Sequence, residues 1–121
     1  MITIDEAWDI LEEAAAELPE VFFESLNGGV SLVPEYKRHP ETDDLYILGE
    51  YHDEPMGMGK YIILYYGSFK RAYAGCSYEE IKQELRKTLR HEFTHHVETL
   101  AGANDLVRRD EEELEDYFDE W

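Results

Sequence analysis

The chain has 121 residues, 43% of them apolar, which is enough for one domain with a hydrophobic core. It carries 29 Asp and Glu residues against 11 Lys and Arg residues, a formal net charge of −18. A field of this sign opposes binding to phosphate backbones and anionic membranes, so the charge argues against nucleic-acid and membrane partners. We expect a single domain over residues 1–121.

The expected compartment follows from cysteine content and from the first segment. Cys76 is the only cysteine, so the chain can form no intramolecular disulfide, which suits a reducing compartment. The first twenty residues are acidic and amphipathic and lack the charged-then-apolar order of a signal peptide. No apolar run approaches the length of a membrane span. These features predict a soluble cytoplasmic protein.

Helical and strand patterns alternate along the first two thirds of the chain. Thr3 and Glu6 have the spacing of a capping box and precede apolar residues at helical spacing, which predicts a helix over residues 5–18, ended by Pro19. Residues 19–26 allow a short helical turn, and Asn27 opens a turn. Three strands are then predicted, at residues 30–33, 45–51 and 60–66. Loops are expected between them, at residues 36–44 and 52–59, and residues 69–73 suit a helix or an extended segment.

A long helix dominates the last third. Ser77 and Glu80 form a second capping-box pattern, which predicts a helix over residues 78–101, closed by Gly102. A last helix is predicted near the end, where apolar residues share one helical face: Leu114, Tyr117, Phe118 and Trp121. The order of helix, strands, helix and helix indicates an α+β fold with helices packed on a small sheet.

The most specific chemical signal is the HExxH motif formed by His91, Glu92 and His95. Residues four apart lie one turn apart on the same side of a helix, so the two histidines can bind one metal ion. Glu92 is displaced from them by about 100°, where it can polarise a water molecule instead of binding the metal. Two imidazoles and a carboxylate favour zinc. The motif therefore predicts a zinc site with Glu92 as general base for peptide hydrolysis.

The helical wheel places the motif at the surface of the long helix. One apolar stripe contains Ile81, Leu85, Leu89, Phe93, Val97 and Leu100. His91 and His95 point about 200° away from the centre of this stripe, toward a cleft. His96 lies within the stripe, where a hydrogen-bonded core histidine is the expected role.

A zinc peptidase site normally has a third protein ligand. Glu98 shares the face of His95 but lies about 4.5 Å further along the axis, which makes it an alternative of lower rank. The chain can fold back after Gly102, and the helix runs about 10 Å past His95 first. That distance favours Asp110 over Asp105, although Asp110 also suits the N-cap of the last helix.

At these residues the chain resembles the minimal zincin-like metallopeptidases of bacteria. The likeness covers nearly the whole chain and includes LPEVF at 18–22, VSLV at 30–33, LGEY at 48–51, YIILY at 61–65 and LRHEFTHH at 89–96. The usual family motif is HExxHxxGxxD, whereas here Gly102 and Asp105 follow four residues later than in that pattern. The resemblance implies a small twisted sheet packed against the HExxH helix, with substrate lying along a strand edge near residues 61–66.

The sequence thus predicts a zinc-dependent metallopeptidase that acts on a peptide or protein substrate, as a monomer or a homodimer. The alternative is a zinc-containing zincin-like binding or regulatory protein without peptidase activity. The acidic last helix suggests a further possibility, an interaction module that docks on a basic partner.

Overall fold

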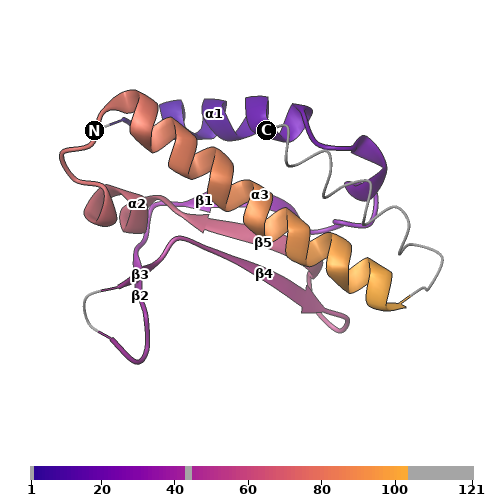
Figure 1. Cartoon of the computed structure of the whole chain (residues 1–121). Coiled ribbons are helices and arrows are strands. Elements are labelled where there is room, and N and C mark those ends of the chain that lie inside the picture. The colour runs from indigo at the N-terminus through magenta and orange to yellow at the C-terminus, as the bar shows by residue number, and fades with distance from the viewer. Residues whose placement is uncertain (1, 43–44, 104–121) are drawn as a thin grey trace.

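The computed structural model describes residues 2–42 and 45–103 (Figure 1). The predicted last helix, Asp105 and Asp110 lie outside the described residues.

Helix α1, Ile4–Ala16, begins at the predicted capping box. The backbone N–H of Glu6 donates to Thr3 Oγ1 at 3.1 Å, and the backbone N–H of Thr3 donates to Glu6 Oε1 at 3.0 Å. The predicted turn after Pro19 is confirmed as a 3-10 helix, η1, Glu20–Phe22. The apolar face of α1 buries Ala7, Ile10, Leu11 and Ala14.

Three strands form the main sheet, in the order β1-β5-β4. They are β1, Gly29–Val33; β4, Gly49–Glu54; and β5, Gly59–Tyr65. β1 runs parallel to β5 and β4 runs antiparallel to it. The strand near residues 61–66 is therefore central and paired on both sides, so the expectation that it offers a free edge is wrong. The two edge strands beside it are β1 and β4.

The segment between β1 and β5 differs from its prediction in three places. The strand predicted at 45–51 divides into β3, Tyr46–Ile47, and β4, because β3 pairs with β2, Lys37–Arg38, while β4 pairs with β5. The predicted loop at 36–44 therefore contains a short strand. The predicted turn at 52–59 is shorter than expected, because β4 continues to Glu54.

Two helices follow the sheet. Helix α2, Tyr66–Ala72, includes most of the segment whose conformation the sequence left open. Helix α3, Tyr78–Ala103, confirms the predicted long helix but not its end, since Gly102 lies within the helix. A helix-closing glycine takes a positive φ, and Gly102 is not among the glycines that do.

Helices α1 and α3 cover one face of the sheet, and the core lies between them and the strands (Figure 1). The predicted stripe on α3 supplies five buried residues to this core: Ile81, Leu85, Leu89, Phe93 and Val97. The molecule is thus a mixed α+β fold with a small sheet. Among the described helices, none has the length and apolar character needed to cross a membrane.

Candidate metal centre

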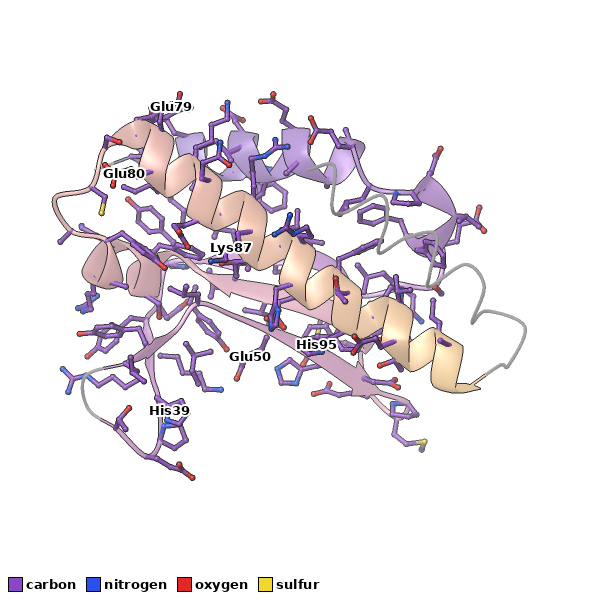
Figure 2. The ribbon with its side chains drawn as sticks, viewed as in Figure 1. His39, Glu50, Glu79, Glu80, Lys87 and His95 are labelled. Carbon is purple, nitrogen blue, oxygen red and sulfur yellow. The ribbon has the colours of Figure 1, made fainter. Side chains whose placement is uncertain are left out.

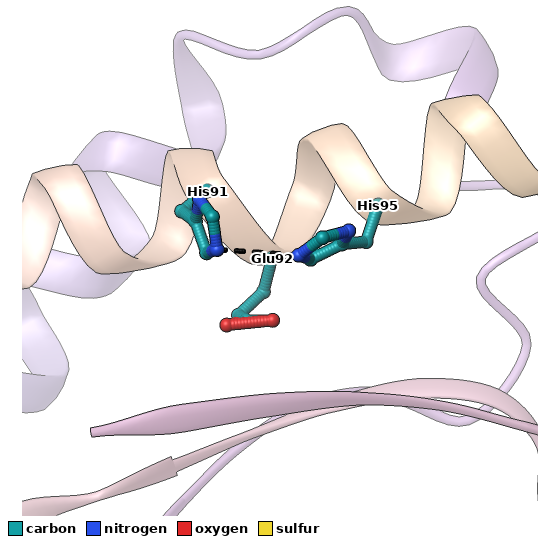
Figure 3. Close-up of side chains that lie close together, drawn as sticks. All are labelled: His91, Glu92 and His95. Carbon is teal, nitrogen blue, oxygen red and sulfur yellow. Dashed lines mark hydrogen bonds between the residues drawn. The ribbon is translucent and has the colours of Figure 1, made fainter. Parts of the chain in front are cut away.

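His91 and His95 converge on the exposed face of α3 (Figure 3). Their Nε2 atoms lie 3.2 Å apart. Two imidazoles that bind a tetrahedral ion at about 2.0–2.1 Å place their nitrogens about 3.3 Å apart. The spacing of the two side chains therefore already matches one edge of such a coordination sphere, as the i, i+4 helical spacing predicted.

Glu92 lies between the two histidines and points from α3 toward the strands (Figure 3). Together the three residues offer ligand atoms that all lie within 4.8 Å of one another, so the group can hold a metal ion. Glu92 is only 7% exposed, and its carboxylate accepts no hydrogen bond from the described residues, so its oxygens are open to the cleft that it lines. Burial raises the pKa of the Glu92 carboxyl, and the neighbouring histidines oppose that rise.

A cleft of about 660 Å³ lies between α3 and the edge strand β4. Its lining residues are Ile47, Gly49, Glu50, Tyr51, His52, Glu92, His95, Glu98 and Thr99. Gly49 permits β4 to approach α3, because a Cβ atom there would lie 3.1 Å from Thr88 Cγ2. The same atom would lie 2.6 Å from Leu64 Cδ2 on the neighbouring strand β5. Figure 2 shows Glu50 and His95, one from each wall. The motif helix therefore has a facing strand across an open cleft.

Glu50 is a cleft residue that the sequence did not single out. Its carboxylate accepts from Lys37 Nζ at 2.6 Å and from the Tyr65 hydroxyl at 2.6 Å, and it lies 3.3 Å from His52 Nε2. Burial pushes the pKa of Glu50 upward, but these contacts outweigh it and lower the pKa overall. Burial together with the bond to Glu50 raises the pKa of Tyr65 to about 12. Only the pairing of separate strands brings these residues together, so no local sequence signal marks Glu50.

His96 has the predicted role of a core histidine. It is fully buried, its Nδ1 lies 2.9 Å from the Tyr51 hydroxyl, and its Nε2 lies 2.9 Å from the Phe22 carbonyl. Because a carbonyl only accepts, Nε2 carries the proton and Nδ1 accepts from Tyr51. Burial lowers the pKa of His96, which favours this neutral form. His96 thereby ties η1 and β4 to the back of the motif helix.

Of the three third-ligand candidates, only Glu98 lies among the described residues. Its Oε2 is 3.7 Å from Nδ1 of His95, whereas the nitrogen that faces His91 is Nε2. Glu98 thus lies on the far side of the imidazole from the convergence point. Asp105 and Asp110 remain predictions. His52, which falls in the loop predicted at residues 52–59, lies instead on β4 in the wall of the cleft.

Comparison with known proteins finds a similar solved structure. No family model and no curated protein matches the chain. A solved structure, the conserved hypothetical protein TTHA0227 from Thermo thermophilus, is similar with a TM-score of 0.71 and 34% sequence identity. The match covers 84% of this chain and 100% of that chain. The chain therefore belongs to the family of this conserved hypothetical protein.

Proposed function

We propose that this protein is a zinc-dependent metallopeptidase with a minimal zincin-like fold. The observation that carries the proposal is the site on α3, where the imidazoles of His91 and His95 converge at 3.2 Å beside the buried carboxylate of Glu92. Glu92 and His95 of this group line a cleft large enough for a peptide segment. The HExxH spacing, the exposure of the two histidines and the burial of the glutamate support the same interpretation.

The residues fit zinc in donor type and spacing. His91 and His95 would hold the ion, with a third protein ligand at Asp110 or, less favoured, Asp105 or Glu98. Bound there, zinc would acidify water and polarise a peptide carbonyl. Glu92 accepts the proton from the attacking water and returns it to the leaving amine. Burial favours this role, because a carboxyl with a raised pKa is a stronger base than an exposed one.

The edge strand β4 supplies the second part of the proposed mechanism. An extended peptide can pair with the free edge of a sheet through main-chain hydrogen bonds. β4 pairs with β5 on one side, and its residues Gly49–His52 line the cleft opposite the motif. A peptide laid along β4 would pass beneath His95 and Glu92. The family resemblance implies that substrate lies along a strand edge near residues 61–66, and we assign that role to the edge of β4 instead.

The metal is tested first. Plasma mass spectrometry on untagged protein should find about one zinc ion per chain, because the site offers one cluster of converging ligands. The His95→Ala variant should lose the ion. No zinc in the wild type, even after zinc is added back, would overturn the proposed function.

Hydrolysis is tested separately, with a peptide library and zinc-loaded protein. We expect zinc-dependent cleavage that Glu92→Gln abolishes while zinc remains bound, since Glu92 moves the proton and does not hold the ion. Cleavage that survives Glu92→Gln would refute this mechanism. Bound zinc without any cleavage of the library would support the alternative, a zincin-like binding or regulatory protein.

A further inference from the structure

We propose that Glu98 selects a Lys or Arg side chain of the bound peptide, so that the protein acts on basic peptides. The inference rests on the proposed peptide site and adds to it a class of substrate and the residue that recognises it. Three observations support it: the charges of the residues that line the cleft, the contacts of each carboxylate among them, and the position of Glu98 on α3.

The cleft has an acidic lining. Three of its nine lining residues are glutamates, Glu50, Glu92 and Glu98, and none is Lys or Arg. Glu92 is more than nine-tenths buried, points toward the strands and has no hydrogen-bond donor among the described residues, so the cleft offers an occupant an acceptor without a protein partner. Lys37, a cation beside this lining, is already bound by Glu50 at 2.6 Å. An occupant with positive charge complements these walls.

The three carboxylates differ in what they can offer a substrate. Glu50 accepts from Lys37 and Tyr65, so its oxygens are occupied. Glu92 is the buried base. The Glu98 side chain is 51% exposed, and its contact with His95 Nδ1 at 3.7 Å is longer than a hydrogen bond. Glu98 is therefore the cleft carboxylate with free capacity to accept from a cationic side chain.

The place of Glu98 sets which substrate residue it meets. It follows His95 by three positions, so it lies about 4.5 Å further along the axis of α3 on the same side. Consecutive residues of an extended peptide advance about 3.4 Å. A substrate side chain one or two residues along the peptide from the scissile bond, which lies at His91 and His95, then faces Glu98. Lys and Arg have the length and the charge to reach it.

The test measures binding apart from hydrolysis. Six-residue fluorescent peptides that differ only in carrying Lys, Gln or Glu at one position are titrated into the full-length Glu92→Gln chain, with zinc and with chelator. Fluorescence anisotropy reports each Kd. We expect the best Lys peptide to bind about threefold more tightly than its Gln counterpart, the range of a partly exposed ion pair. Raising NaCl to about 0.5 M should reduce this preference.

Substitutions then assign the preference to Glu98. In the Glu92→Gln background, Glu98→Gln should abolish the Lys preference and Glu98→Lys should transfer it to the Glu peptide. Glu79→Gln is the matched control, since it removes the same charge from an exposed site at the other end of α3 (Figure 2), and it should change nothing.

Each contrary result has a distinct meaning. Equal binding of all three peptides, or a Lys preference that survives Glu98→Gln, would overturn the proposal. A loss of zinc from Glu98→Gln would also overturn it, because Glu98 would then act at the metal. Since the preference is measured on a chain that cannot use Glu92 as a base, it is observed even if the wild type cleaves nothing. Failure of the peptidase proposal and failure of this one are therefore separable.

Discussion

Glu92 and His96 lie four positions apart on α3, and burial favours the neutral form of both. The neutral His96 is satisfied, because Tyr51 and Phe22 hold its two ring nitrogens. Glu92 has no comparable donor among the described residues. His96 thus stabilises the fold, whereas the ionised Glu92 costs stability at neutral pH, as expected of the proposed general base.

The cost of Glu92 predicts how stability depends on pH. Its folded pKa lies above the ordinary value of 4.5, so its contribution to stability is fully present below 4.5 and is lost as pH rises through the raised pKa. Glu92→Gln removes this loss. We expect the metal-free variant to be more stable than the wild type by about 1 kcal/mol at about pH 8, with the gain shrinking toward about pH 5.

Urea unfolding in the presence of a chelator measures this difference at both pH values. Glu79→Gln, an exposed change on the same helix, serves as the control and should show no such pH trend. A variant less stable than the wild type at about pH 8 would mean that the Glu92 carboxylate is held by donors in the folded chain, contrary to this account.

At the scale of the elements, a helix or strand could be predicted from the sequence when its pattern of apolar residues was long. Helix α3 could be predicted because its 26 residues repeat one apolar stripe, and the same repeat placed His91 and His95 on the opposite face. Strand β2 could not, because its two residues form a strand only through pairing with β3. The break between β3 and β4 could not either, because it arises from their pairing with different strands. The edge position of β4 and the contacts of Glu50 depend on strand order, which no local pattern encodes.

Gly49 lets β4 pack closely against both β5 and α3. We expect Gly49→Ala to destabilise the protein by about 1–3 kcal/mol, since the added Cβ would lie 2.6 Å from Leu64 Cδ2. Leu64 is fully buried and cannot move aside without disturbing the core. Urea midpoints at an unchanged m value measure the loss.

The matched control is Gly102→Ala, the same substitution in a helix. Among the described residues, a Cβ atom at Gly102 has no neighbour within 4 Å, so alanine should stabilise the chain by up to about 1 kcal/mol. If Gly49→Ala were as stable as the wild type, β4 and α3 would have room to separate, and Gly49 would not set the width of the cleft.

At the scale of the whole molecule, the histidines of the candidate metal centre and the hydrophobic core lie on opposite faces of α3. The core joins α1, α3 and the sheet through buried residues such as Leu11, Ile62 and Phe93, and none of the site histidines belongs to it. The packing of the core therefore does not depend on the two candidate ligand histidines. For that reason the metal-free chain is a sound reference for the stability measurements above, unlike small zinc domains that unfold without their ion.

The net charge of −18 is the other property of the whole molecule, and it predicts how the fold responds to salt. Excess like charge destabilises a folded state, and dissolved ions screen that repulsion. We expect the metal-free chain to gain about 1 kcal/mol or more between about 0.02 M and 0.5 M NaCl, measured as the free energy of unfolding in urea. NaCl is preferable to a sulfate salt, which would strengthen apolar burial by itself. A loss of stability would instead mean that ion pairs such as Arg86–Glu17 and Lys37–Glu50 outweigh the repulsion, because salt weakens those pairs.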